Sequence, residues 1–217
     1  MTKEEKLEKF TERLTEDNNT LSVILFGSQA RGGSTPESDI DLVVILKEGY
    51  KRVAEYFEDQ AFEIIYTTEQ AAIEYWEKNK QDAVGLWTVA KVVFDRDGTG
   101  ARLRDFGTKL CTELPPEVDA STLDHLRFDF EDSLKAIERV RENDAATASL
   151  LLHKKVASLI DLFFDLKRMW RPAPKQQIAQ ILNLDTDLGK IIQDFYTAES
   201  IENQVTLAKK IGNQILA

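Results

Sequence analysis

Apolar residues in the first half of the chain occur in short runs separated by polar turns, a pattern typical of strands alternating with helices. The runs are rich in the β-branched and aromatic residues that strands prefer. Strands are predicted over residues 22–26, 39–46, 61–66 and 91–94. Helices are predicted up to about residue 17, over residues 50–57, from residue 69 onward and over residues 99–112.

Pro115-Pro116 is the clearest break in the chain, and the strand pattern disappears after it. Beyond the break, apolar residues recur at helical spacing. Helices are predicted over residues 123–140, 150–166, 176–182, 188–196 and 199–216. The pattern therefore predicts an α+β fold, with a mixed-sheet domain over residues 1–115 and an all-α helical bundle over residues 116–217.

Two carboxylates, Asp39 and Asp41, lie one residue apart at the second predicted strand. Alternate residues of a strand face the same side, so these side chains project together while Ile40 and Leu42 point into the core. Two like charges held this close favour a bridging divalent cation, and oxygen ligands suit Mg²⁺. The pair is therefore a candidate metal site.

The first predicted strand leads into a polar turn that begins with Gly27-Ser28. A turn of this kind is able to present its backbone N–H groups to an anion. A phosphate-binding turn beside a metal-binding carboxylate pair is the arrangement used in phosphoryl and nucleotidyl transfer.

Glu63 is a third acidic candidate, because it lies between Phe62 and Ile64 on an apolar strand. An ionised carboxylate in such a place is costly unless a metal or another partner neutralises it. We interpret Glu63 as completing the metal cluster or as accepting the proton of an attacking hydroxyl. Exposure at the edge of the sheet is the alternative, and the sequence does not separate these roles.

The composition is that of a folded protein, with 42% hydrophobic and 30% charged residues. The net charge of −10 disfavours a nucleic-acid partner, because neutralised phosphates supply most of the affinity for nucleic acids. A neutral or cationic small molecule suits this charge better. The single cysteine, Cys111, rules out an internal disulfide and fits a reducing compartment. No apolar run approaches about 18 residues and no signal peptide is evident, so a cytoplasmic protein without a membrane partner is expected.

Together these motifs resemble the nucleotidyltransferase superfamily that includes DNA polymerase beta. The features that carry the resemblance are Gly27-Ser28, Arg31-Gly32, Ser38-Asp39-x-Asp41 and Glu63. The resemblance covers roughly residues 21–97. The short first domain and the helical bundle after it are similar in layout to the minimal nucleotidyltransferases and to the aminoglycoside and lincosamide adenylyltransferases. The resemblance implies a nucleotidyltransferase domain that uses Mg²⁺ as cofactor and ATP as donor substrate.

The resemblance also implies a role for each motif residue. Gly27 would let the backbone approach the nucleotide, and Ser28 with the turn amides would hold the β- and γ-phosphates. Asp39 and Asp41 would bind Mg²⁺ ions at the α-phosphate and the leaving pyrophosphate. Arg31 is a further phosphate-binding candidate, and the alternative is that it is a solvated turn residue or a salt-bridge partner of Glu37.

The helical half offers three lysines as nucleotide-binding candidates, Lys154, Lys155 and Lys175. A surface cation that complements a helix terminus is the alternative for each of them and for Arg171. Acidic residues such as Asp129 are candidates for binding a cationic acceptor, with a solvated helix face as the alternative. The three tryptophans are interpreted as packing residues rather than as platforms for a base.

The leading functional hypothesis is Mg²⁺-dependent transfer of a nucleoside monophosphate, AMP from ATP, to a hydroxyl of a small molecule such as an aminoglycoside-like antibiotic. One alternative is a regulatory enzyme that adds AMP to a protein, as some minimal nucleotidyltransferases do in toxin–antitoxin pairs. Another is a nucleotide-binding module without turnover. A homodimer is compatible with the resemblance. The acceptor and the preferred nucleotide are not determined by these motifs.

Overall fold

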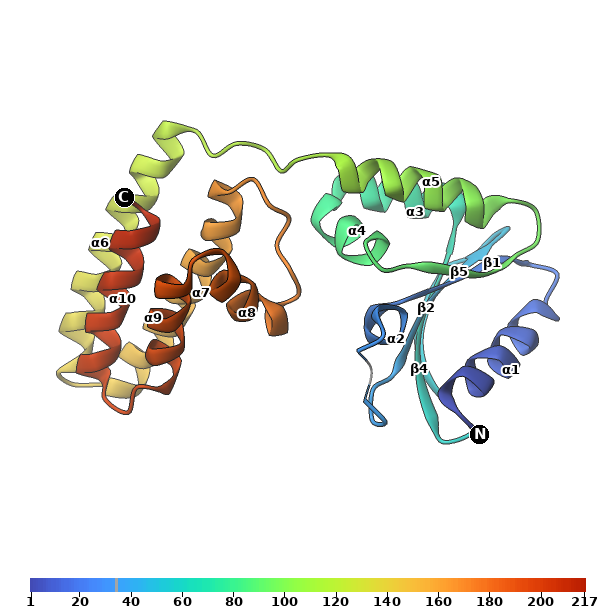
Figure 1. Ribbon diagram of the computed structural model, residues 1–217, viewed down its shortest axis with the longest axis horizontal. Coiled ribbons are helices and arrows are strands. Elements are labelled where there is room, and N and C mark those ends of the chain that lie inside the picture. Colours follow the sequence, from blue (N-terminus) through green and yellow to red (C-terminus); the bar gives the residue numbers. More distant parts are fainter. Residues whose placement is uncertain (34) are drawn as a thin grey trace. The chain divides into compact units, whose positions relative to one another are not determined.

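The computed structural model describes residues 1–33 and 35–217, which form two compact units, Met1–Glu113 and Leu114–Ala217 (Figure 1). Within the described residues, every strand belongs to the first unit, and the second unit is built from helices. The fold class is therefore α+β, as the sequence pattern predicts.

The first unit is built on a five-stranded sheet with the order β3-β4-β2-β1-β5. The strands are β1 (Thr20–Phe26), β2 (Ile40–Leu46), β3 (Lys51–Phe57), β4 (Gln60–Thr68) and β5 (Lys91–Asp95). β2 and β4 run parallel, and the other neighbouring pairs are antiparallel. The sheet is therefore mixed, and the two strands that carry the acidic candidates lie inside it rather than at an edge.

One face of the sheet is covered by α1 (Lys3–Thr15) (Figure 1). Phe10 of this helix is fully buried and stacks on Phe62 of β4, with ring centroids 4.0 Å apart. Ile40 of β2 is fully buried in the same apolar cluster. Because side chains alternate along a strand, the burial of Ile40 turns its neighbour Asp41 to the opposite face of the sheet.

Helices α3, α4 and α5 pack beside one another, and α5 contacts β1 and β5. Their bounds are Glu69–Lys78, Lys80–Trp87 and Thr99–Thr112. Gly100 of α5 lies against the Ser22 side chain, which faces away from the α1 cluster. Trp76 and Trp87 are buried in this layer as an edge-to-face pair with ring centroids 5.1 Å apart. These two tryptophans are packing residues, as predicted.

The helix predicted over residues 50–57 is wrong, because this segment forms strand β3. β3 pairs antiparallel with β4 through a turn in which Glu58 and Asp59 both have positive φ, 50° and 61°. Val53 and Phe57 pack against the buried cluster. Their spacing of four residues fits one face of a helix and one face of a strand equally well. Pairing with β4 decides between the two, and local spacing does not report it.

All residues of the second unit are described, and their helices surround one cluster of buried apolar side chains. The helices are α6 (Ala120–Arg141), α7 (Ala145–Leu166), α8 (Pro174–Leu184), α9 (Thr186–Thr197) and α10 (Ile201–Ile215). Side chains of Asp119, Asp144, Asp185 and Ser200 accept hydrogen bonds from the first turns of α6, α7, α9 and α10. Caps of this kind satisfy amides that lack a partner within the helix. The predicted all-α bundle is confirmed.

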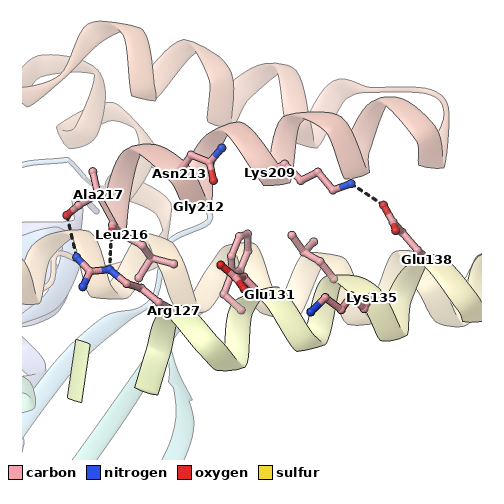
Figure 2. Close-up of a pocket in the computed structure, with 11 residues that line it drawn as sticks. Arg127, Glu131, Lys135, Glu138, Lys209, Gly212, Asn213, Leu216 and Ala217 are labelled. Atoms are coloured by element: carbon pink, nitrogen blue, oxygen red, sulfur yellow. Dashed lines mark hydrogen bonds and ion pairs between the residues drawn. The ribbon is translucent and has the colours of Figure 1, made fainter. Parts of the chain in front are cut away.

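A groove of about 600 Å³ lies between α6 and α10 in the second unit (Figure 2). At one end Arg127 donates hydrogen bonds to the backbone oxygens of Leu216 and Ala217, at 2.6 and 3.1 Å. At the other end Lys209 and Glu138 form an ion pair of 2.5 Å (Figure 2). These contacts hold the two helices together along the groove.

Gly212→Ala is expected to destabilise the bundle at this groove. A Cβ atom at Gly212 would lie 2.1 Å from a ring atom of Phe130, which is only 5% exposed and is held by its core neighbours. Alanine gains about 1 kcal/mol of helix propensity over glycine. Overpacking costs about 1–3 kcal/mol, so we expect a net loss of about 1 kcal/mol in the free energy of unfolding.

Urea denaturation followed by circular dichroism measures this change. Gly85→Ala is the matched control, because Gly85 is also helical but has no heavy atom within 4 Å of an added Cβ. The control should stabilise the protein by up to about 1 kcal/mol. A Gly212→Ala variant as stable as its control would contradict the packing account.

Candidate active site

The strand register brings three carboxylates together on one face of the sheet. Asp41 of β2 lies directly opposite Glu63 of β4 in the parallel pairing. Asp39 lies immediately before β2 and, two residues from Asp41, faces the same side. One oxygen from each of the three side chains lies within 4.8 Å of the others. Asp39 is exposed, and the other two residues are half-buried.

These three carboxylates fit a divalent cation of the Mg²⁺ type. Their oxygens are the hard ligands that Mg²⁺ prefers, and two oxygens on opposite sides of one Mg²⁺ lie about 4.2 Å apart. The observed separations, all within 4.8 Å, are compatible with one or two such ions. Three like charges this close also repel one another unless a cation lies among them. Binding of Mg²⁺ itself stays a prediction.

Position 27 requires a glycine, because the backbone there passes very close to the side chain of Asp41. Phe26, the last residue of β1, is the register partner of Asp41, so Gly27 follows directly beside the carboxylate. A Cβ atom at Gly27 would lie 1.8 Å from Oδ2 of Asp41, and its φ of +70° is also unfavourable for other residues. The sequence predicts that this glycine lets the backbone approach a phosphate. The structure shows the approach to Asp41, and the approach to phosphate stays a prediction.

The predicted Gly-Ser turn is a short helical segment, α2 (Gly27–Arg31), that ends at Gly32 with a φ of +80°. Phe26 precedes it and supplies no side-chain cap to its first amides. Ser28 is half-buried at its start, and Arg31 is exposed at its end. The predicted contacts of Ser28 and Arg31 with nucleotide phosphates stay predictions.

The segment before Asp39 is held by two residues that the sequence analysis did not identify. Lys3 of α1 donates hydrogen bonds to the backbone oxygens of Thr35 and Ser38, at 2.5 and 2.6 Å. Gln60 of β4 is 5% exposed and donates to the same Ser38 oxygen at 3.0 Å. No local pattern marks these contacts, because they join residues 22 to 35 positions apart.

Glu63 has a cationic neighbour, Arg52 of β3. Both Nε, at 2.9 Å, and Nη2 of the guanidinium donate to the same oxygen, Oε1. These hydrogen bonds, followed by the charge of Glu63, raise the pKa of Arg52 above its ordinary value. The alternative explanation of Glu63 as a sheet-edge residue is wrong, because β3 separates β4 from the edge. The contact between Arg52 and Glu63 was not predicted from the sequence, because the segment of Arg52 was expected to be helical.

The cationic candidates of the second unit differ in their surroundings. Lys155 forms an ion pair with Asp129 at 2.6 Å, and Arg171 binds Asp161 at 3.0 Å. These four side chains line a cavity of about 290 Å³. Lys154 and Lys175 are both exposed, on α7 and α8. The predicted role of Lys154, Lys155 and Lys175 in nucleotide binding stays a prediction.

The family of the chain follows from a comparison with known protein families. Residues 7–143 match the family model described as a nucleotidyltransferase domain. This match covers more than half of the chain and includes all three carboxylates and the α2 turn. The chain belongs to the nucleotidyltransferase family. The match confirms the resemblance drawn from the motifs of this nucleotidyltransferase. Membership of the family assigns generic nucleotidyl transfer to it. The match extends past the first unit and covers the whole of α6.

A solved structure supports the fold. The nucleotidyltransferase is similar to the crystal structure of a nucleotidyltransferase-like protein from Exiguobacterium sibiricum 255-15, with a TM-score of 0.52 and 15% sequence identity. The similarity covers 99% of this chain and 74% of the other. A search of curated proteins found no match. Within the described residues, no helix combines the length and apolarity needed to cross a membrane.

Proposed function

We propose that this nucleotidyltransferase transfers AMP from ATP to a hydroxyl group of a small-molecule acceptor. The observation that carries the proposal is the cluster of Asp39, Asp41 and Glu63, whose oxygens lie within 4.8 Å of one another. The start of α2 lies directly beside it, since Gly27 approaches Asp41 so closely that no side chain fits between them. A phosphate-binding turn and a cation site would thus act on the same nucleotide.

Each residue of the cluster has a role in this reaction. Asp39 and Asp41 would hold Mg²⁺, which supplies positive charge where negative charge develops on the phosphates. Ser28 and the first amides of α2 would donate hydrogen bonds to the β- and γ-phosphates, and Arg31 would add positive charge there. Glu63 would bind the cation or accept the proton of the attacking hydroxyl, and either role requires an available oxygen.

The bond changes of the reaction are those of an in-line displacement. The acceptor oxygen forms a bond to the α-phosphorus, and the bond from that phosphorus to the β-phosphate bridging oxygen breaks. The acceptor hydroxyl would give its proton to a base, for which Glu63 is the candidate, and pyrophosphate leaves with the electron pair of the broken bond. Most of the rate would come from holding the acceptor and the phosphate in line and from neutralising charge.

The charge of the protein supports a small acceptor. The net charge of −10 opposes binding of a nucleic-acid backbone, whose phosphates require positive charge on the protein. The same charge attracts a cationic molecule. A hydroxylated amine, of which aminoglycoside-like antibiotics are an example, meets both requirements.

The test is a screen for pyrophosphate release with each of the four nucleoside triphosphates, Mg²⁺ and a panel of hydroxylated acceptors. We expect release with ATP and a cationic polyhydroxylated acceptor, with the acceptor gaining the mass of AMP. The protein carrying both Asp39→Asn and Asp41→Asn controls for contaminating enzymes. Incubation with α-labelled ATP and cell lysate tests the alternative. Label on a protein rather than on a soluble metabolite would contradict the small-molecule proposal.

A further inference from the structure

Arg52 lies on the same face of the sheet as the three carboxylates. Its register partner on β4 is Ile65, two residues beyond Glu63, so Arg52 and Glu63 are diagonal neighbours on adjacent strands. Val53, the next residue of β3, packs on the opposite face against the buried cluster. The alternation along β3 therefore points Arg52 to the carboxylate side.

The guanidinium of Arg52 binds only one of the two oxygens of Glu63. Nε and Nη2 both donate to Oε1. Among the contacts of the described residues, Oε2 accepts no hydrogen bond, so it is the oxygen left for another partner. Two donors that converge on Oε1 hold this oxygen in place more firmly than a single contact does.

The charge of Arg52 acts in two ways at this cluster. It offsets part of the repulsion among three carboxylates that lie within 4.8 Å of one another. It also competes with any divalent cation for Glu63. The side chain of Arg52 is 63% exposed and that of Glu63 34% exposed, so water and salt weaken both effects. A modest change in cation affinity is therefore expected rather than a large one.

We propose that Arg52 is a positioning residue that withholds one oxygen of Glu63 from the bound cation and orients the other for the transfer reaction. This inference rests on the proposed function. Without Arg52, Glu63 would be free to rotate and to bind the cation with both oxygens. The cation would then bind more tightly, while the carboxylate would lose the orientation that the reaction needs.

The test measures Mn²⁺ affinity in the full chain without nucleotide, by the loss of the electron paramagnetic resonance signal of free Mn²⁺. Arg52→Met is expected to bind Mn²⁺ about threefold to tenfold more tightly than the wild type, because Glu63 can then offer both oxygens to the cation and one nearby positive charge is lost. It should nevertheless turn over more slowly in the pyrophosphate screen. Arg52→Lys keeps the charge but loses the paired donors, so its Mn²⁺ affinity should lie between those of the wild type and Arg52→Met while its turnover falls.

Two further variants separate this effect from general electrostatics. Arg104→Met removes an arginine of similar exposure, 59%, from α5 and should change Mn²⁺ affinity less than twofold. In the background of Glu63→Gln, Arg52→Met should change Mn²⁺ affinity less than twofold and leave turnover unchanged, because only the weaker charge effect of Arg52 on Asp39 and Asp41 remains.

The proposal is overturned if Arg52→Met binds Mn²⁺ no more tightly than the wild type, if its turnover is unchanged, or if its full effect persists in the Glu63→Gln background. A wild-type protein that binds no Mn²⁺ overturns it as well. The Mn²⁺ measurement needs no nucleotide, so a wild-type protein that binds Mn²⁺ but releases no pyrophosphate refutes the proposed function while the affinity comparison still decides the role of Arg52.

Discussion

Asp41→Asn is expected to lower the rate of nucleotidyl transfer about a thousandfold or more, because it removes a proposed anionic ligand of the cation from the centre of the cluster. Asp41 is the register partner of Glu63 and also lies against Gly27. An asparagine side chain has nearly the same shape, so the packing around it should be kept. The loss therefore reports the charge and the ligand oxygen rather than the fold.

Steady-state release of pyrophosphate measures the loss, and thermal unfolding with and without MgCl₂ measures cation binding. Mg²⁺ should raise the unfolding temperature of the wild type, since a ligand of the folded state stabilises it, and should raise that of Asp41→Asn much less. Asp59→Asn is the matched control. Asp59 is exposed in the β3–β4 turn with a φ of 61°, which asparagine also adopts readily. Full activity in Asp41→Asn would exclude the acidic cluster as the reaction site.

Gly27→Ala is expected to lower transfer on the order of a hundredfold, because the new methyl group would occupy the space of the Asp41 carboxylate. The added Cβ would lie 1.8 Å from Oδ2 and 2.7 Å from Cγ of Asp41, so either the carboxylate or the start of α2 must move. The φ of +70° adds a backbone cost. We expect the close contact and the backbone cost together to lower the free energy of unfolding by about 2 kcal/mol.

Gly33→Ala is the control for this substitution. An added Cβ at Gly33 has no heavy atom within 4 Å, and its φ is not in the left-handed region. Gly33→Ala should leave both the activity and the Mn²⁺ affinity near those of the wild type. In Gly27→Ala, Mn²⁺ affinity should fall with activity, because Asp41 is displaced. Unchanged Mn²⁺ affinity in this variant would mean that Asp41 can move without leaving the cluster.

Most elements of the fold follow from local pattern. The amphipathic spacing of α6, α7 and α10 and the apolar runs of β1, β2 and β4 each bury one face or both, so their type is readable without a partner. The carboxylate pair is equally local, because Asp39 and Asp41 share a side of any strand that contains them. The Gly-Ser turn, followed at short distance by these acids, was enough to identify the family.

β3 and its arginine were not readable in this way. Val53 and Phe57 fit either a helix or a strand, and only the pairing with β4 makes the segment extended. Arg52 therefore had no predicted neighbour, although it contacts Glu63. The support of the segment before Asp39 by Lys3 and Gln60 was missed for a similar reason, because these contacts depend on how α1 and β4 pack around it.

The chemistry of each carboxylate and the side of the strand on which it lies are thus properties of short segments, because backbone geometry alone sets the alternation of side chains along a strand. The meeting of Glu63 with Asp39 and Asp41 depends on the parallel register of β2 and β4, which pairs residues 22 positions apart. Register is decided by the burial of Ile40, Phe62 and their neighbours against Phe10, a property of the whole packed core. Distance in space between such residues is therefore fixed only when the sheet and its covering helix form together.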